Sequence, residues 1–352
     1  MGIRANYSGK QFVQDCNTVN NVVYGLVMVG PGTTDAADSS WYSVDQDIYN
    51  YCGFFTLRAV IFPDPTLLTL DNLLSDNYTS QYLMRRMTVN GTSFITDFNQ
   101  YLGGFNDVRL VDDPMGVPGL TDSFAAAIWA IEFIMEFFYI DGFRMDFYNS
   151  FKQGARQGIL GSNGGYTPTA LYSALLLADL AVLNGPYIDK TVVTPGLSSS
   201  INMYGLDNYN TYGVLLLNKD NDTTHSGEVE VMIRDPSGLY CIYLTASSLD
   251  ATSNITLGGL EFIDNNSRPL GNYTEFKYVV DANGYYQIPL NYSQVAYCVT
   301  KNDFTYNPLP IDLGLANAEG WLILPIRVAV LAVLMAVLLM WWCCLLMWWC
   351  CV

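Results

Sequence analysis

The spacing of apolar and polar residues divides the chain into two parts. Up to about residue 195, apolar runs at helical spacing alternate with short strand-like runs, which predicts a β/α architecture. From about residue 200, short apolar runs recur between turn-forming residues, which predicts an antiparallel β-sandwich. The alternation is clearest where Val229, Val231 and Ile233 share one face. The predicted strands are Ile201–Leu206, Tyr212–Leu217, Glu228–Ile233, Leu239–Thr245, Glu275–Val280, Tyr285–Leu290 and Gln294–Thr300.

One segment of the first part is apolar on nearly every side. Within Ser123–Ile140, Glu132 and Glu136 lie one helical turn apart on one face of the expected helix. Thr121 is expected to cap the helix at its start. We expect a buried helix here rather than a membrane span. A turn that follows it predicts a strand over 143–147.

The C-terminal segment 328–352 contains no charged residue and no proline. At a rise of about 1.5 Å per residue, this hydrophobic helix is long enough to cross a hydrocarbon core of roughly 30 Å. Two interpretations are open. A single-pass anchor with cysteines that can be palmitoylated is favoured over a cleaved lipid-anchor signal. The preceding segment 301–327 is expected to be a stalk.

Composition and charge exclude several classes of function. The 352 residues are 51% hydrophobic, which suffices for a substantial core. The 16 Lys and Arg against 33 Asp and Glu give a net charge of -17, so nucleic acid is not an expected partner. The single histidine, His225, lies in a polar run, which excludes a catalytic histidine pair or a histidine-rich metal site. We expect neither a metal nor a cofactor.

Cysteines and glycosylation sequons favour an oxidising, extracellular setting. Four of the 8 cysteines, Cys16, Cys52, Cys241 and Cys298, lie outside the apolar tail and suit two disulfides. Sequence order favours pairing Cys16 with Cys52 and Cys241 with Cys298 among the possible connectivities, and the alternative is that one or both pairs stay free and buried. Asn-x-Ser/Thr sequons occur at Asn6, Asn77, Asn90, Asn221, Asn254, Asn265, Asn272 and Asn291.

The first residues, MGIRANYSGKQF, lack the basic and then apolar pattern of a signal peptide. A secreted protein should begin with one, so we expect that the true N-terminus is missing from this chain. With the sequons and the tail, the expected location is the cell surface or the extracellular face of a membrane, with the C-terminus as the anchor.

Three runs of sequence, in this order, resemble a known family. They are GLTDSFAAAIWAIEFIMEFFYIDGFRMDFYN at 119–149, YTPTALYSALLLADLAVLNG at 166–185 and INMYGLDNYNTYGVLLLNKD at 201–220. Over about residues 10–300 the chain resembles the heparanase and β-glucuronidase family of retaining glycoside hydrolases. The resemblance rests on the order of the parts and on the apolar pattern. It implies a (β/α)₈ barrel followed by a β-sandwich, and a carbohydrate as the partner.

The resemblance also implies where the catalytic carboxyl groups should lie. Retaining chemistry needs two of them about 5 to 5.5 Å apart. The nucleophile of the family is a Glu that ends a strand, and its position falls on Asp112, or on Asp113 if the register shifts by one. Asp is one methylene shorter than Glu, and a misplacement of about 1 Å can cost on the order of a hundredfold in rate. The alternative for this acidic pair is an ordinary solvated turn.

Other positions depart further from the family. The acid/base Glu of an Asn-Glu step has no counterpart, because the chain contains no Asn-Glu dipeptide. A His-x-Tyr-like strand end is replaced by 61–64 (IFPD), and a substrate-side His is replaced by Asp146. Arg109 and Arg144 are candidate ligands for an anionic sugar, with ion pairs at the edge of the core as the alternative.

These features favour a catalytically degenerate, membrane-tethered glycoprotein that binds glycan or assembles with partners. The alternative is an active retaining β-glycosidase whose N-terminal half is missing. A half-barrel would expose two strand edges, so docking with another chain is a further expectation. In a third interpretation the β-sandwich is an adhesive module. Tyrosines offer surfaces for stacking on sugars, although most are expected to be core residues or cross-strand pairs; examples are Tyr204, Tyr209, Tyr212, Tyr285 and Tyr286. The expected domains are 1–195 (partial barrel), 196–300 (β-sandwich), 301–327 (stalk) and 328–352 (anchor).

Overall fold

The structure is a computed structural model, and it divides the chain into two units, Met1–Asp303 and Phe304–Val352. All the residues that it describes lie in the first unit, so the predicted stalk and hydrophobic tail lie outside the described residues. Besides Gln14 and Thr18, the described ranges are 55–86, 88–89, 92–93, 102–111, 116–139, 144–147, 159–162, 165–184, 187–191, 200–207, 211–220, 227–233, 237–262 and 269–300.

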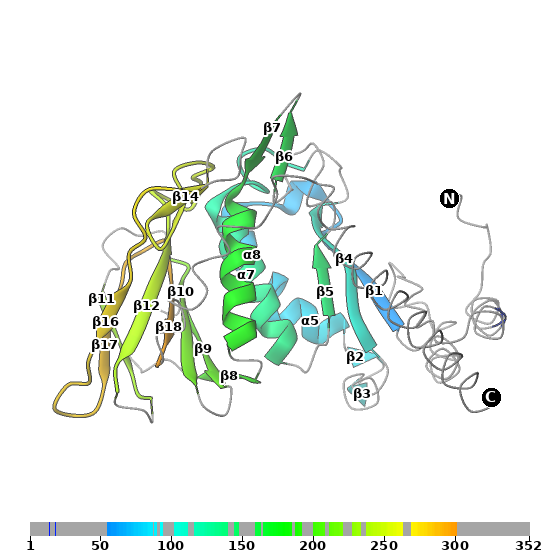
Figure 1. Cartoon of the computed structure of the whole chain (residues 1–352). Coiled ribbons are helices and arrows are strands. Elements are labelled where there is room, and N and C mark those ends of the chain that lie inside the picture. Colours follow the sequence, from blue (N-terminus) through cyan, green and yellow to red (C-terminus); the bar gives the residue numbers. More distant parts are fainter. Residues whose placement is uncertain are drawn as a thin grey trace, which may run out of the picture. The chain divides into compact units, whose positions relative to one another are not determined.

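A short parallel sheet forms the first part of the fold. Its order is β1 (Phe55–Phe62), β4 (Leu102–Val111) and β5 (Arg144–Phe147), with β4 in the middle (Figure 1). Phe62 pairs with Val111, so β1 and β4 end at the same level. The strand predicted over 143–147 is confirmed as β5. The β/α part predicted from the alternating pattern is therefore present.

Two helices accompany this sheet. The first, α7 (Phe124–Tyr139), is the apolar helix predicted at 123–140, and nearly all of its residues are buried. The second, α8 (Ala170–Asn184), contacts the β part, since Tyr297 donates a hydrogen bond to the carbonyl oxygen of Leu180 at 3.3 Å. None of the helices within the described ranges combines the length and the apolar character needed to cross a bilayer.

The start of α7 differs from the prediction in one detail. Ser123 caps the helix, because its hydroxyl accepts a hydrogen bond from the backbone N–H of Ala126 at 3.3 Å. Thr121 was the wrong candidate: its hydroxyl bonds instead to both backbone groups of Val117, in the turn before the helix. Two further amides at the start of α7 donate to carbonyl groups of the β part, Phe124 to Ala251 and Ala125 to Leu249, each at 2.8 Å. The β part thus satisfies helix N–H groups that have no partner within the helix.

Short elements complete the first part. Between β1 and β4 the chain forms η1 (Pro65–Leu67), α4 (Leu70–Leu73), η2 (Asp76–Tyr78), α5 (Ser80–Arg86) and the small pair β2 (Thr88–Val89) and β3 (Thr92–Ser93). Between β5 and α8 lies the hairpin of β6 (Ile159–Ser162) and β7 (Gly165–Pro168).

The second part is dominated by one large antiparallel sheet. Along its main path the order is β15-β14-β13-β12-β18-β10-β9-β8, and β16 pairs with β12 outside that path. The bounds are β8 (Tyr187–Thr191), β9 (Ile201–Asp207), β10 (Tyr212–Asn218), β12 (Leu239–Thr245), β13 (Thr256–Leu257), β14 (Leu260–Phe262), β15 (Pro269–Leu270), β16 (Phe276–Tyr278) and β18 (Gln294–Val299).

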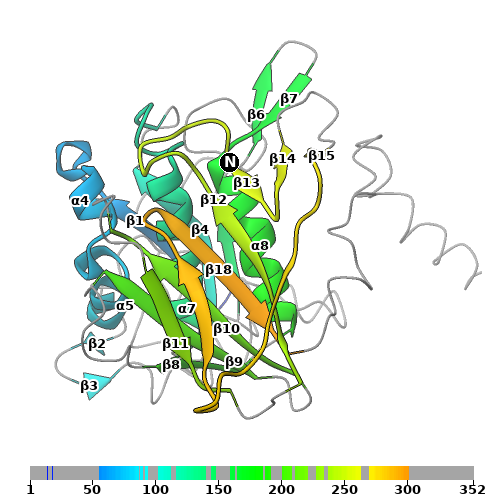
Figure 2. The ribbon, with the colours of Figure 1, turned by 90° about the vertical axis from the view of Figure 1, so that its left-hand side faces the viewer.

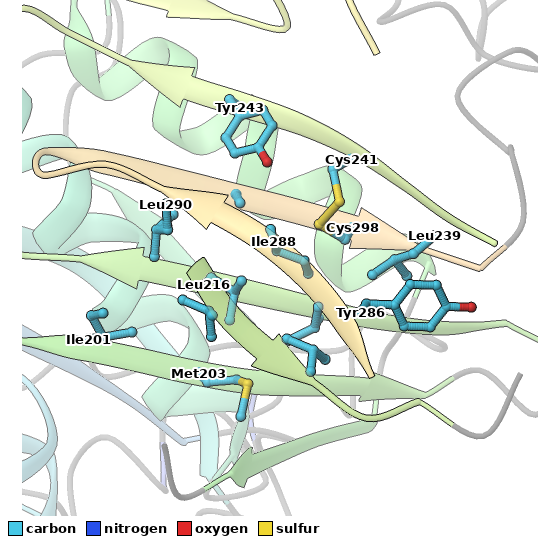
Figure 3. Close-up of a cluster of buried hydrophobic side chains, with 14 residues drawn as sticks. Ile201, Met203, Leu216, Leu239, Cys241, Tyr243, Tyr286, Ile288, Leu290 and Cys298 are labelled. Carbon is cyan, nitrogen blue, oxygen red and sulfur yellow. A yellow bond between two sulfur atoms is a disulfide. The ribbon is translucent and has the colours of Figure 1, made fainter. Parts of the chain in front are cut away.

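A second, smaller layer covers part of this sheet. It is the antiparallel pair of β11 (Gly227–Val231) and β17 (Tyr286–Leu290), which lies across β9, β10 and β18 in Figure 2. Val229 and Val231 point into the core between the layers, as their alternation predicts, and the partly buried Ile233 packs against it. The core also contains Leu216, Ile288 and the Cys241–Cys298 disulfide (Figure 3).

Every strand predicted between 201 and 300 is present, with ends that differ by a few residues at most. The pattern missed β13, β14 and β15, which are only two or three residues long and carry little alternation. It also missed β8, which pairs with β9. The large sheet therefore takes its first strand from before residue 196, where the expected boundary lies.

Candidate functional site

The carboxyl ends of the parallel strands are where the sequence places its candidate chemistry. In a sheet of parallel strands these ends meet at one edge, and residues just beyond them form the usual site in β/α folds. β1 ends at Phe62 and is followed by Pro63 and Asp64, and the neighbouring β4 ends at Val111. The candidate nucleophile positions Asp112 and Asp113 follow β4 directly in the sequence, but both lie outside the described residues.

Asp64 is a described acidic residue at this edge, and its carboxylate already has a structural role. It caps η1 by accepting hydrogen bonds from the backbone N–H of Thr66 at 3.0 Å and from the Thr66 hydroxyl at 2.7 Å. These bonds hold the pKa of Asp64 below its ordinary value. A general acid needs a raised pKa, so Asp64 is poorly suited to protonate a leaving group.

The other predicted substrate-side residues lie on β4 and β5. Arg109 is opposite Val60 in the register of β1 and β4 and is only 9% exposed, which leaves little of its side chain accessible to a ligand. Arg144 and Asp146 are in β5, where the structure describes the backbone alone. β5 is parallel to β4 and pairs with it, but Arg144 is opposite Gly104, so the register does not place it beside Arg109.

A buried polar network joins α7 to the β part. Lys219, just after β10, has its ammonium nitrogen 2.9 Å from Glu132 Oε1 and 3.0 Å from Asp76 Oδ1. Asn202 in β9 donates a further hydrogen bond to Glu132 Oε1. One turn along α7, Glu136 accepts a hydrogen bond from the hydroxyl of Tyr204 at 2.7 Å. Sequence reasoning placed both glutamates on one face of the helix, but it did not identify these partners.

Burial dominates the electrostatics of this network. It raises the pKa of Glu132, and the nearby Lys219 only partly opposes this effect. Burial alone would lower the pKa of Lys219, but the carboxylates of Glu132 and Asp76 outweigh it and leave that pKa raised. Glu132 Oε2 is buried and has no hydrogen-bond partner among the described residues. The side chain of Glu132 is inaccessible to solvent, so we interpret the network as a structural brace and not as a catalytic pair.

The tyrosines expected to stack on sugars are mostly unavailable. Tyr204 and Tyr286 are fully buried, the first against Glu136 and the second in the core between the layers, so both are core residues, as was expected of most of these tyrosines. Tyr212 and Tyr285 are partly exposed, and Tyr209 lies outside the described residues. Alternation alone could not separate core tyrosines from surface ones, because it does not show which face of a strand meets the core.

The described sequons and one cysteine pair can be located. Asn77, Asn254, Asn272 and Asn291 are all exposed. Cys241 and Cys298 are paired across β12 and β18 and joined by a disulfide. Cys16, Cys52, Asn6, Asn90, Asn221 and Asn265 lie outside the described residues. Within the described ranges, no group of three or more His, Cys, Asp or Glu is placed to hold a metal ion.

Comparison with known proteins shows similarity of structure alone. No family model matches the chain. No curated protein sequence matches it either. Among solved structures, it is similar to a 4-O-α-L-rhamnosyl-β-D-glucuronidase from Fusarium oxysporum, with a TM-score of 0.64 and 15% identity over 82% of this chain and 63% of that one. It is also similar to the GH51 arabinofuranosidase from Xanthomonas axonopodis pv. citri, with a TM-score of 0.59 and 12% identity over 84% and 63%. A third similar structure is a GH51 α-L-arabinofuranosidase from Thermotoga petrophila, with a TM-score of 0.55 and 9% identity over 86% of this chain and 65% of that one.

These similarities define the class of fold. A mixed α/β part followed by a large antiparallel sheet is a glycoside hydrolase-like fold, and the chain has it. At these identities the likeness extends to the fold and not to the activity. The chain spans 63% of the length of the first two structures, so the activity and substrates of the whole protein are matters for proposal.

Proposed function

We propose that this protein is a membrane-tethered extracellular glycoprotein, related to heparanase and β-glucuronidase-type hydrolases, that binds glycan without hydrolysing it. The glycoside hydrolase-like fold supports a function that involves carbohydrate. The sequence resemblance supports the narrower relationship. In this proposal residues 1–195 are part of a (β/α)₈ barrel, and glycan binding or surface assembly replaces catalysis.

The structural role of Asp64 is the main support for the interpretation that the protein has lost catalytic activity. At the end of β1 the resembled family has a His-x-Tyr-like pair, and this chain instead has a carboxylate engaged with Thr66. Two further positions differ from the family: Asp112 is at the position of a Glu, and Asp146 is at the position of a His. The changes at Asp64 and Asp146 remove groups that would orient or hydrogen-bond a sugar, and the change at Asp112 shortens the attacking carboxylate by one methylene. Three departures from the family at separate positions of the sequence favour loss of catalysis over an isolated substitution.

The outer strands of the parallel sheet support a partner. Within the described residues β1 and β5 are its outer strands, and outer strands present unpaired backbone groups. In the proposal another chain docks there and completes the barrel-like part. Cross-linking of the protein on intact cells, followed by mass spectrometry of peptides from 55–62 and 144–147, tests this contact. Cross-links confined to the β part would contradict it.

The proposed location rests on the sequons and on the sequence of the tail. All four sequons on described residues have exposed Asn side chains, as attachment of a glycan requires. The proposal includes a disulfide between Cys16 and Cys52 and anchoring through 328–352. Treatment with an N-glycosidase should lower the mass of the protein from eukaryotic cells, and alkaline carbonate should leave it in the membrane fraction. An unchanged mass together with release by carbonate would overturn the location.

Turnover is the direct test of the proposed function. The full chain should bind immobilised glycans and release no aryl group from an aryl β-glucuronide or β-glucoside. Detectable hydrolysis that survives purification to homogeneity contradicts the degenerate interpretation.

One specific observation favours a second candidate, an active retaining β-glycosidase. The similar structure with the TM-score of 0.64 is described as a glucuronidase, and Asp112 follows directly on the strand next to β1. In that case Asp112 is the nucleophile, and Asp112→Asn in the full-length protein should abolish turnover while leaving the protein folded. Unchanged turnover would remove Asp112 from this role.

A further inference from the structure

An open cleft of about 430 Å³ lies in the β part, away from the parallel sheet. Two short strands share one edge of β12: β16 pairs with Leu239–Cys241, and β13 pairs with Leu244 and Thr245. The cleft lies between these two pairings, and Tyr243 of β12 is in its lining. We call it the β-module cleft, and it is lined by Tyr243, Thr245, Thr256, Gly258, Gly259, Thr274, Phe276, Tyr278, Pro289, Asn291 and Gln294.

Hydroxyl groups in the β-module cleft are arranged in pairs. The hydroxyl oxygens of Tyr243 and Tyr278 lie 2.8 Å apart, and so do those of Thr245 and Thr256. In each pair one hydroxyl donates to the other, and the acceptor retains its own O–H for a ligand. Burial, together with the bond to Tyr278, raises the pKa of the Tyr243 hydroxyl, so it stays protonated.

An amide group adds a further donor. Gln294 accepts a hydrogen bond through Oε1 from the backbone N–H of Asn291 at 2.9 Å. This contact fixes the orientation of the Gln294 side chain and leaves its NH₂ group as a donor toward the cleft. Thr274 donates its hydroxyl hydrogen to the carbonyl oxygen of Asn272, so its oxygen can accept. The lining thus offers both donors and acceptors at fixed positions.

Exposed aromatic rings border the same cleft. Phe276 is 45% exposed, and its ring meets that of Tyr243 edge to face with 5.5 Å between the centroids. Tyr273, which is 42% exposed, packs beside Gly258. No residue in the lining is charged. Flat apolar rings beside fixed hydroxyl and amide groups suit a ligand with an apolar face and many hydroxyls.

We propose that the β-module cleft binds an uncharged pyranose sugar, with its C–H face on Phe276 and its hydroxyls bonded to the tyrosine, threonine and glutamine side chains. The proposal deepens the proposed function and rests on it only for the expectation that the protein meets glycans. It places that contact in the β part and selects neutral sugars over uronic acids, because the lining carries no cation to pair with a carboxylate.

The sugar can come from two sources. Asn291 lines the cleft and is also the acceptor of a sequon, so a glycan on this residue would begin at the cleft itself. The other source is a glycan of another molecule. Ser293→Ala separates the two, because it destroys the sequon and keeps the Asn291 side chain.

The test is ligand-observed NMR titration of the full chain from eukaryotic cells, with methyl β-D-glucopyranoside, methyl β-D-glucuronide and N,N′-diacetylchitobiose as probes. The first two differ only in the oxidation state of one carbon and therefore in charge. Phe276→Ala should weaken binding of the uncharged probes about tenfold. The matched control is Met232→Ala, since Met232 is 66% exposed and does not line the cleft, and it should leave binding unchanged.

The outcomes separate the sources and the two proposals. Binding of the uncharged probes by the wild-type chain supports an external glycan. Binding that appears only in Ser293→Ala supports the glycan on Asn291. Three outcomes would overturn the proposal of a sugar site in the cleft. They are absence of binding in both the wild type and Ser293→Ala, binding of the glucuronide as tight as that of the uncharged probes, and equal effects of Phe276→Ala and Met232→Ala. Hydrolysis of an aryl β-glycoside measured on the same samples would overturn the degenerate interpretation and leave the cleft proposal intact.

Discussion

The ammonium group of Lys219 lies 2.9 Å from Glu132 Oε1, although the two residues are 87 positions apart in the chain. Lys219 comes from the end of the β9–β10 hairpin, and Glu132 comes from the middle of α7. Both side chains are almost completely buried. This pair therefore joins the helix of the first part to the large sheet of the second, in a setting where either charge alone would be costly.

Removal of the cation should destabilise the protein strongly. Lys219→Met leaves Glu132 buried without its charged partner, and the expected loss in the free energy of unfolding is about 3–5 kcal/mol. Chemical denaturation followed by circular dichroism measures it. Asp76→Asn is the matched control, because Asp76 is exposed and contacts the same ammonium group, and it should cost no more than about 1 kcal/mol. Equal losses in the two variants would show that burial of the pair is not the cause.

The stability of the protein should depend on pH through the protonation of Glu132. Burial raises its pKa in the folded state, so the folded protein holds this proton more tightly than the unfolded chain does. The stabilisation is fully present below the ordinary pKa of 4.5 and is lost as the pH rises through the raised value. The free energy of unfolding of the wild type, relative to that of Glu132→Gln, should thus decrease as the pH rises from about 4.5. A difference that grows in favour of the wild type over this range would contradict the assignment.

The Cys241–Cys298 disulfide should contribute measurably to stability. It closes a sequence separation of 57 residues within the core. Replacement of both cysteines by alanine should lower the free energy of unfolding by about 2–4 kcal/mol. The reduced wild-type protein keeps both sulfur atoms and separates loss of the cross-link from loss of packing. If reduction leaves the denaturation midpoint unchanged, the cross-link does not stabilise the fold.

The local pattern of apolar and polar residues was sufficient to predict many of the strands and helix α7. The strand of Val229 and Val231 alternates cleanly because one face meets the core and the other meets solvent, so its period of two is visible in the sequence. Helix α7 could be placed for a different reason, since its apolar run is long and is followed in the sequence by an Asp-Gly pair. The strands that were missed, such as β13, are too short to show any period.

The contacts between distant segments could not be predicted in the same way. Glu132 and Lys219 were both visible as charged residues, but only the packing of α7 on the hairpin brings them together. The sequence left open whether Tyr204 is a core residue or a surface residue, and its contact with Glu136 depends on the same packing. The β-module cleft depends on two short strands sharing the edge of β12, which a pattern read along one strand does not reveal.

The turn between β13 and β14 offers a local test of this edge. Gly258 and Gly259 both have positive φ values, of 56° and 78°, and form a two-residue hairpin loop in which glycine is strongly favoured. A Cβ atom at Gly259 would lie only 2.6 Å from the carbonyl oxygen of Asn272. Gly259→Ala therefore combines backbone strain, worth about 1–2 kcal/mol, with a clash against backbone, and should also reduce sugar binding in the cleft.

Gly284→Ala is the matched control for the clash. Gly284 has a similar positive φ of 85°, but a Cβ atom there would meet nothing within 4 Å. Its substitution should cost only the backbone strain of about 1–2 kcal/mol and leave the cleft unaffected. Thermal denaturation and the sugar titration, run on both variants, measure the two effects. The clash with Asn272 would be refuted if Gly259→Ala were no more destabilising than Gly284→Ala, because the close approach of the 258–259 turn to the 272–274 segment predicts a clear difference between them.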